Sequence, residues 1–376
     1  MKKFLTILLA LALALCLTGL AEEEDHWTCY KCGEDNDGGE KCASCGAERA
    51  IWTCPDCGKE GNASDACDEC DAPRPVLWTC PNCGKVFNSS ETCAECGAKH
   101  PVWTCIDCGK RDNAGDNCAE CGAARPVWTC VKCKKLNNGG DFCDDDSCGA
   151  ARPAAGDLYV FGVYENEPIE WIVLRFDRDG SLVLLSRCAL DSKPFNDSYA
   201  ATSWEASSLR KWLNDGFLKA AFGADEQKII LETTLKNEDN PVYTTSTKTP
   251  PYGDTKDKVW LLSINEVCDY FDKDKPDFSY IRKGNYARKC VPTEYAIAQG
   301  IWLSEEEELD GASTCWWWLR SPASNTKTAA IVLASGYVRY GIGMSVDYAK
   351  VGVRPAITVQ PANMPEAIGV VSEHLD

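Results

Sequence analysis

The sequence is short of histidine and of basic side chains. It has three histidines, His26, His100 and His374, and 39 lysines and arginines against 57 acidic side chains. The resulting net charge of −18 repels phosphate, and neutralisation of phosphates supplies most of the affinity for nucleic acid. This balance argues against a nucleic-acid partner. Histidine-based catalysis is not expected between residues 157 and 361, because no histidine lies there.

Motifs that are typical of enzymes are also missing. The sequence contains no nucleophile elbow, Walker loop or Gly-x-Gly-x-x-Gly. Carboxylate pairs such as Asp269 with Asp272 are expected on a solvated helix face. We therefore expect no catalytic residues and a protein that is not an enzyme.

One long apolar run is present, and it lies at the N-terminus. A positively charged start precedes the run from Phe4 to Leu20, which ends at the small residue Ala21. This pattern predicts a secretory signal over residues 1–21, so the protein is expected to be secreted or at the cell surface. Membrane attachment is expected only through an uncleaved signal or a lipid anchor at Cys16.

Cysteine is what the sequence has in excess. Of 25 cysteines, twenty lie between Cys29 and Cys148, where Trp-Thr-Cys recurs five times at offsets of 25 or 26 residues. Each module has the spacing C-x2-C-x9-C-x2-C, except that the last gap of the fifth widens to x4. The predicted metal ligands are Cys29, Cys32, Cys42 and Cys45; Cys54, Cys57, Cys67 and Cys70; Cys80, Cys83, Cys93 and Cys96; Cys105, Cys108, Cys118 and Cys121; and Cys130, Cys133, Cys143 and Cys148.

The spacing of these cysteines has a physical reason. Two C-x2-C turns can place four thiolates around one tetrahedral zinc ion. A module of about 25 residues with almost no aliphatic core needs a metal or disulfides to fold. We therefore expect about five structural zinc ions. A disulfide scaffold is the alternative, because an exported chain meets an oxidising compartment.

The module resembles small zinc ribbons and the RanBP2-type zinc finger, through Trp-x-Cys-x2-Cys followed by Asn36 and a second cysteine pair. That family includes RNA binders and ubiquitin binders, but its RNA-contacting basic residues are mostly missing here. Counting from the cysteines, the place of Asn36 is taken by Gly61, Phe87 and Asp112 in the next three modules, each followed by Asn, and by Asn137 in the fifth.

The tryptophan of each module has two possible roles. It either covers its own metal site, as we expect, or joins a row of exposed binding aromatics. Short linkers that contain proline, such as Ala72–Pro75, predict separate modules with limited flexibility between them. The array is therefore interpreted as a stalk or interaction arm.

Residues 157–361 have the composition of an ordinary globular domain, and mixed strand and helix patterns predict an α+β fold. Predicted strands cover Leu158–Tyr164, Glu170–Phe176, Leu182–Ser186, Ala329–Ala334, Tyr337–Tyr340 and Val351–Val359, and predicted helices cover Trp204–Phe217, Ser263–Phe271 and Thr293–Gln299. Thr202 with Glu205 predicts a capping box for the first helix. The predicted organisation is a signal at 1–21, zinc ribbons at 22–50, 51–75, 76–101, 102–126 and 127–153, the domain at 157–361 and a tail at 362–376.

Motifs spread over the last 200 residues resemble the DUF6273 family, a domain of unknown function common in exported bacterial proteins. They include Glu170–Leu174, Ser208–Asn214, Trp317–Pro322 and Gly352–Ala356. The closing Trp-Leu-Arg-Ser and Gly-Val-Arg-Pro sequences also resemble C-type-lectin-like folds, including relatives of formylglycine-generating enzymes. This second resemblance implies a C-type-lectin-like fold.

Five side chains are the candidate ligand-binding residues: Trp316, Trp317, Trp318, Arg320 and Arg354. Aromatic rings and guanidinium groups together suit a carbohydrate or a protein ligand. The other interpretation, which we favour, is a place in the core with each Arg held by a buried carboxylate, because alternate residues of a Trp-Trp-Trp strand must face opposite sides.

The leading hypothesis is an exported zinc-binding surface protein, with the array as stalk or interaction arm and a C-terminal domain that binds carbohydrate or protein. An extracytoplasmic enzyme acting on cell-wall or sulfated material is one alternative. Formylglycine-generating enzymes use cysteines on this fold, which draws attention to Cys290 and Cys315. Buried thiols or one structural disulfide are expected there instead. A purely structural spacer or zinc store is the other alternative.

Overall fold

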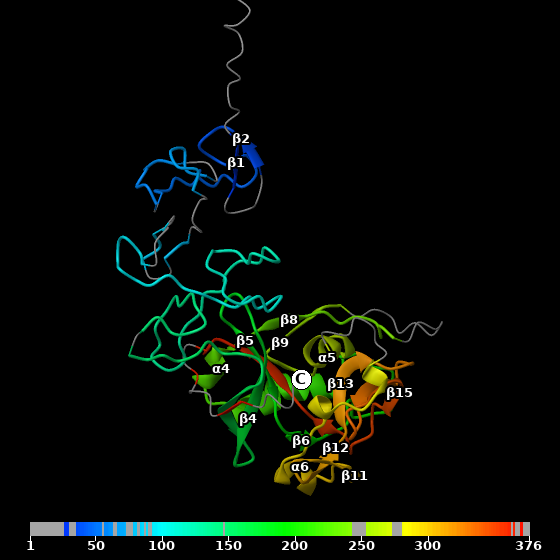
Figure 1. Ribbon diagram of the computed structural model, residues 1–376. Helices are drawn as coiled ribbons and strands as arrows, with labels where there is room; N and C mark the ends of the chain where they lie inside the picture. The colour runs from blue at the N-terminus through cyan, green and yellow to red at the C-terminus, as the bar shows by residue number, and fades with distance from the viewer. Residues whose placement is uncertain are drawn as a thin grey trace, which may run out of the picture. The chain divides into compact units, whose positions relative to one another are not determined.

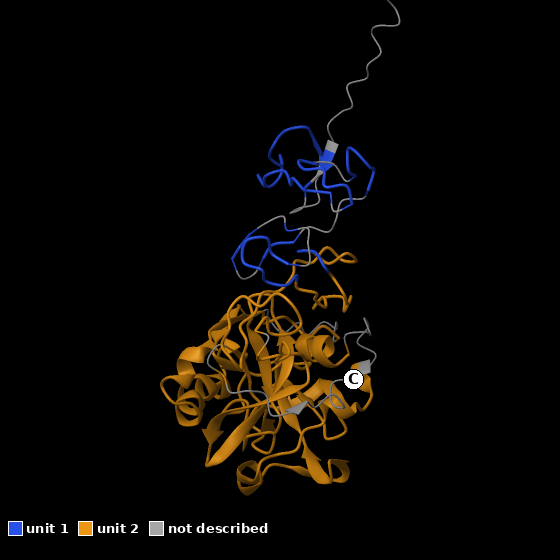
Figure 2. Ribbon diagram, turned by 60° about the vertical axis from the view of Figure 1, so that its left-hand side comes forward, with its two compact units in different colours: residues 1–100, 114–116 blue, residues 101–113, 117–376 orange. Residues whose placement is uncertain are grey.

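The computed structural model describes residues 26–29, 35–54, 56–62, 66–72, 78–80, 83–85, 88, 92–145, 147–242, 253–272, 280–361, 364 and 369–370. The predicted signal at residues 1–21 lies outside these ranges. None of the helices in the described ranges is long and apolar enough to cross a membrane. The chain divides into two compact units, residues 1–100 with 114–116 and residues 101–113 with 117–376 (Figure 2). The second unit joins most of the fourth module and all of the fifth to the C-terminal domain.

Each cysteine module is built on a minimal pairing between its Trp and an Asn. In the first module β1 (His26–Thr28) pairs with β2 (Asp35–Asp37), with Trp27 opposite Asn36. In the other four modules a single antiparallel bridge does the same, between Trp52 and Asn62, Trp78 and Asn88, Trp103 and Asn113, and Trp128 and Asn138. Chains this short cannot form a conventional core, so the modules depend on their cysteine sites.

The C-terminal domain contains two larger sheets (Figure 1). The seven-stranded sheet runs β10 (Val259–Trp260), β17 (Ala356–Val359), β5 (Leu182–Ser186), β4 (Glu167–Phe176), β3 (Asp157–Tyr164) and β18 (Gly369–Val370), and β7 (Ile230–Leu231) also pairs with β17. The five-stranded sheet runs β15 (Val338–Ser345), β14 (Thr328–Val332), β13 (Trp317–Pro322), β16 (Gly352–Val353) and β6 (Asp191–Ser192). Two hairpins complete the described strands: β8 (Thr233–Leu235) with β9 (Thr255–Asp257), and β11 (Leu303–Leu309) with β12 (Ala312–Cys315). The mixture of sheets and short helices confirms the predicted α+β class.

Two of the three predicted helices begin where their caps predict. In α5 (Ile264–Phe271) the Ser263 hydroxyl accepts from the backbone N–H of Glu266, and the Glu266 carboxylate accepts from the N–H of Ser263. Helix α6 (Glu294–Ala298) is capped by the hydroxyl of Thr293. These local hydrogen bonds are complete within four residues, which is why the sequence predicts them.

The predicted start of the first helix is wrong. The helix begins at Ser208, because the hydroxyl of Ser207, and not Thr202, accepts from the N–H of Arg210. The helical segment consists of α2 (Ser208–Trp212), then a π-helical turn (Leu213–Phe217), and then α3 (Leu218–Ala221). The remaining helical segments are α4 (Glu226–Ile229) and the 3₁₀ turns Tyr280–Arg282 and Tyr286–Arg288.

The predicted last strand, Val351–Val359, is divided between the two sheets. Its first part, β16, pairs with β6 and β13 in the five-stranded sheet, whereas its second part, β17, pairs with β5 in the seven-stranded sheet. Pro355 stands at the break and has no N–H to give to a ladder. The residue before it, Arg354, is therefore held between the two sheets.

One hydrophobic core runs through the C-terminal domain and into the fifth module. It contains Trp128, Cys130, Val131 and Cys143 together with the buried residues of both sheets. The first four modules instead have small clusters of their own, each made of a tryptophan and cysteines of the same module. The fifth module is therefore packed as a part of the C-terminal domain.

Candidate metal centres and predicted ligand residues

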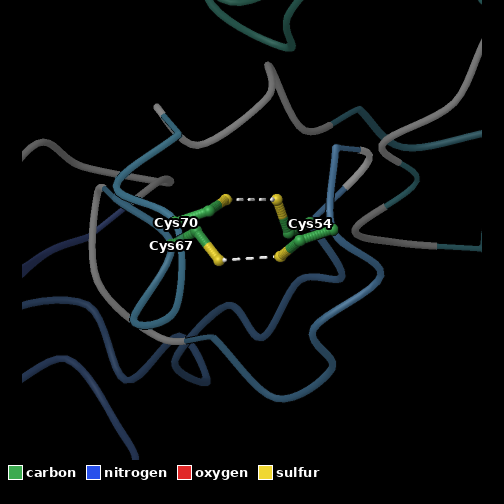
Figure 3. Close-up of side chains that lie close together, drawn as sticks. Cys54, Cys67 and Cys70 are labelled. Atoms are coloured by element: carbon green, nitrogen blue, oxygen red, sulfur yellow. Dashed lines mark hydrogen bonds between the residues drawn. The ribbon is translucent and has the colours of Figure 1, made fainter.

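The predicted cysteines gather into five groups. Modules two to five each bring together all four, and their sulfur atoms lie within 4.8 Å of one another. In the first module Cys29, Cys42 and Cys45 converge in the same way, and Cys32 lies outside the described residues. Figure 3 shows Cys54, Cys67 and Cys70 of the second module turned towards a common centre. Five cysteine groups that could hold a metal ion are thus present.

The sulfur spacing fits a metal site better than disulfides. The first cysteine of a module faces the fourth, and the second faces the third, at Sγ–Sγ distances of 3.4–3.7 Å. Four sulfurs at the usual Zn–S length would be about 3.8 Å apart, whereas bonded sulfurs are about 2.05 Å apart. All cysteines in the described ranges are free thiols. Four thiolates in a tetrahedron are the donor set that zinc takes in structural sites.

The thiols of one site differ in acidity, and this difference decides which of them carry a proton before a metal binds. The backbone N–H of Lys135 lowers the pKa of Cys133 to about 7. For Cys108 the N–H of Lys110 acts in the same direction, but burial and the neighbouring thiols raise the pKa to about 12. A site of four thiols therefore retains protons that a metal ion must displace, because only thiolates bind the metal.

Glycine follows most C-x2-C turns because the backbone there is left-handed. Gly58, after Cys57, has φ +76° and donates its N–H to the carbonyl of Cys54. Where a module lacks this glycine, Asp71 and Lys134 adopt the same conformation, with φ 57° and 63°. Such φ values are costly for a residue with a Cβ, so these two turns keep their shape at a cost in stability.

A buried asparagine joins the two cysteine turns of each module. In the fourth module the Asn113 amide donates to the carbonyls of Trp103 at 3.2 Å and Lys110 at 2.6 Å, and its oxygen accepts from the N–H of Ala119 at 3.1 Å. The equivalent residues are Asn36, Asn62, Asn88 and Asn138. The cysteine spacing alone predicted this asparagine one residue too early in modules two to five. The reason is that the turn before Asn36 is one residue shorter than the corresponding turn of the other modules.

The tryptophans of all five modules are buried. Their exposed fractions lie between 0 and 5% for Trp27, Trp52, Trp78, Trp103 and Trp128. In the first module the ring also donates to the carbonyl of Gly38 at 3.0 Å, and in the fifth to that of Gly140 at 2.7 Å. The rings cover their own cysteine sites and do not form an exposed aromatic row.

In modules three to five of the described part of the chain, a threonine of one module bonds to an aspartate of the next, a contact that the sequence patterns did not predict. The Thr104 hydroxyl donates to Asp141 at 2.6 Å, and the Thr104 N–H donates to it at 3.0 Å. Arg152 completes the junction with bonds to Asp141 at 2.8 Å and to the Thr104 carbonyl at 3.0 Å. Thr79 bonds to Asp116 in the same way. The sequence pattern that could have revealed this contact is an acidic residue two places before the third cysteine of each module: Glu40, Asp65, Glu91, Asp116 and Asp141.

The structure places four of the five predicted ligand-binding residues in the core. Trp317 and Trp318 have no exposed surface, and their ring N–H groups donate to the carbonyls of Arg288 and Lys193. Arg320 binds the Glu266 carboxylate through both of its terminal nitrogens, and Arg354 lies beneath Trp317. These side chains hold the two sheets in place.

Trp316 is the one of the five that is partly exposed. Its ring stacks on Trp302 with centroids 4.2 Å apart, and the two planes are inclined by 26°. The five residues therefore do not form a common surface.

A sizeable cavity lies elsewhere, between α5, β8 and the turn after β4. Its volume is about 690 Å³. Seven carboxylates and three cations line it, and all three cations are already paired: Arg175 with Asp177 at 2.6 Å, Lys236 with Asp254 at 3.9 Å, and Arg320 with Glu266. Tyr270 and Trp260 are its aromatic residues. An acidic cavity with aromatic walls can accept hydrogen bonds from hydroxyl or amino groups.

Comparison with known proteins bears on the C-terminal domain. Neither the curated proteins nor the solved structures gave a match to the chain. Residues 179–361, from the turn before β5 to the residues after β17, match the family model described as a domain of unknown function (DUF6273), which confirms the predicted resemblance for this region.

Proposed function

We propose that the chain is an exported binding protein in which five structural zinc ions fold the N-terminal modules and the C-terminal domain recognises a carbohydrate or protein. The observation that carries the zinc part is the convergence of cysteine sulfurs at 3.4–3.7 Å in each module. Export rests on the N-terminal sequence pattern. A cell-surface location follows from it.

The modules support the C-terminal domain and do not themselves carry its ligand. Their tryptophans are covered, and the fifth module shares the core of the domain. An array whose last member is built into the next domain suits a stalk or interaction arm. A zinc store fits less well, because release of zinc from the fifth module would disturb the domain.

The cavity beside α5 is the proposed ligand site. Its carboxylates suit the hydroxyl groups of a sugar or the cationic side chains of a peptide, and the faces of Tyr270 and Trp260 suit apolar ring surfaces. The ring N–H of Trp260 is buried without a partner among the described residues. We propose binding without catalysis there, on a fold of the C-type-lectin-like kind, for which the two sheets and the closing Gly-Val-Arg-Pro motif are the support.

Metal analysis of the purified full-length protein tests the first part of the proposal. We expect about five zinc ions per chain, because each module offers four thiolates at tetrahedral spacing. Thiol titration after unfolding in a chelator should find the twenty module cysteines reduced. A protein with ten disulfides and no metal would overturn the zinc assignment.

A combined glycan and basic-peptide array tests the second part. We expect the protein to retain a ligand, and Asp269→Asn with Glu238→Gln to weaken retention by about tenfold, because each removes a charge from the cavity. Asp225→Asn is the matched control, since Asp225 lies on the exposed start of α4. Retention that is unchanged in the double variant would place the ligand elsewhere, and turnover of an arrayed compound would show an enzyme.

A further inference from the structure

Arg354 is a buried cation with unused hydrogen-bonding capacity. It lies between β16 and β17 and is 2% exposed. Its Nε donates to the carbonyl of Ser186 at 2.9 Å, and its guanidinium carbon lies 5.0 Å from the centre of the Trp317 ring. Its Nη1 has no hydrogen-bond partner among the residues that the structure describes.

The other well-buried arginines of the domain have carboxylate partners. Arg288 pairs with Asp272 and Arg320 with Glu266. Within the described ranges Arg354 forms no ion pair, in a chain that has 57 acidic side chains. A buried charge without a counter-ion is costly. An anion that bonds to Nη1 would offset this cost.

A cavity of about 150 Å³ lies against Arg354. Its apolar walls come from Ile172, Val291 and Leu309. Two further cations and one carboxylate also line it, and both cations are already paired: Arg187 with Glu170 at 2.8 Å and with the lining carboxylate Asp310 at 3.6 Å, and Lys289 with Glu307 at 2.8 Å. Arg354 is thus the cation of this cavity that lacks a carboxylate.

We propose that this cavity binds a small carboxylate, with the acid group on Arg354 and an apolar tail against Ile172, Val291 and Leu309. An apolar cavity of about 150 Å³ accommodates roughly six heavy atoms, since one of this size binds benzene. A short aliphatic acid has this size and carries one charge. The last residue of a peptide, with its free C-terminus, offers the same chemistry. The site is separate from the cavity beside α5 and does not depend on the function proposed for it.

Neighbouring thiols are the competing counter-ions. Burial raises the pKa of Cys188, which lines the cavity, to about 12, so this thiol stays neutral. Burial also opposes ionisation of Cys290, but a hydrogen bond from Cys315 and the charge of Arg354 lower its pKa overall. A thiolate at Cys290 would neutralise Arg354 from the core side, and the test must separate this case from a bound acid.

Titration calorimetry with butyrate, using butyramide as the uncharged control, tests the proposal on the full-length protein. We expect one butyrate site with an affinity in the millimolar range, about what six heavy atoms can supply, and no heat from butyramide. Arg354→Met should weaken butyrate binding by about tenfold or more. Val291→Phe, which fills the cavity and keeps the charge, should do the same, whereas Lys228→Met, which removes an exposed cation of α4, should have no effect.

Two further measurements complete the test. An acetylated dipeptide with a free C-terminus that binds, beside its amidated form that does not, would identify peptide ends as a source of the acid. The proposal is overturned by equal binding of butyrate and butyramide, or by butyrate binding that survives both cavity variants. It is also overturned if butyrate does not bind and the thiolate absorption of the wild type is lost in Cys290→Ser, because Arg354 is then neutralised from within.

Discussion

Cys133→Ser in the fifth module should destabilise the C-terminal domain, whereas Cys57→Ser in the second module should leave that domain unchanged. Both cysteines are the second ligand of their module and both are exposed. The difference lies in what the module touches. Loss of the four-cysteine site frees Trp128, which belongs to the core of the domain, while Trp52 belongs to a cluster within its own module.

Several contacts join the fifth module to the domain. The Lys134 ammonium donates to the carbonyl of Met364 at 2.9 Å, and the Arg152 guanidinium lies 5.3 Å from the centre of the Phe176 ring. At Gly180, in the turn between β4 and β5, an added Cβ would lie 3.4 Å from the carbonyl oxygen of Val127. The β4–β5 turn is therefore shaped to receive the module.

The expected size of the effect follows from the buried tryptophan. Removal of a large aromatic side chain from a core costs about 3–5 kcal/mol. In a domain of about 200 residues each kcal/mol lowers the unfolding temperature by about 2–4 °C, so Cys133→Ser should lower it by roughly 6–20 °C. Hydrogen exchange of β5 and β17 reports on the domain alone. Equal exchange in the wild type and in Cys133→Ser would show that the module does not stabilise the domain, and faster exchange in Cys57→Ser would show that its effect is not specific.

Arg320→Met should destabilise the domain by about 3 kcal/mol, the lower end of the range for breaking a buried ion pair. The Arg320 guanidinium also donates to the carbonyls of Leu261 at 2.9 Å and Lys236 at 3.2 Å. Its partner Glu266 is 23% exposed and closes the capping box of α5. Loss of Arg320 therefore leaves a poorly hydrated carboxylate at the start of this helix.

Urea unfolding of Arg320→Met, Glu266→Gln and the double variant measures the pair directly. The double variant should be less destabilised than the sum of the single variants, because the second substitution removes the charge that the first one leaves unpaired. Lys228→Met, which breaks the exposed pair with Asp225, should cost less than about 0.5 kcal/mol. An Arg320→Met protein of wild-type stability that has lost ligand retention would instead make Arg320 a ligand contact.

The cysteine sites could be predicted because their geometry is local. Each C-x2-C turn closes within five residues, and the same is true of the capping box of α5 and the N-cap of α6. The shorter turn before Asn36 could not be predicted from the cysteine spacing. The segment from Asn36 to the third cysteine is one residue longer than in the other modules, so the distance from the second to the third cysteine stays the same. Hydrogen bonding to Trp, and not distance from cysteine, fixes the position of the asparagine.

Exposure of the tryptophans of β13 could not be predicted from strand alternation. Trp317 and Trp318 point to opposite sides of the strand, and alternation alone does not say whether either side meets solvent. Both are buried because both faces of β13 are covered. The backbone carbonyl of Arg288 accepts from the ring N–H of Trp317, and that of Lys193 accepts from the ring N–H of Trp318. The docking of the fifth module was missed for a related reason. Contacts between distant segments leave no periodic mark in a sequence.

The junction between modules has a consequence for how such a chain can change in evolution. The fourth module supplies the Thr of one junction and the acidic residue of another, and all five modules carry both residue types at these places, so both halves of the contact are copied whenever such a module is copied. Duplication or deletion of whole modules ahead of the fifth would preserve every four-cysteine group and the residues of each junction. The length of the array can then change by whole modules, while the module that shares the core of the domain stays the same.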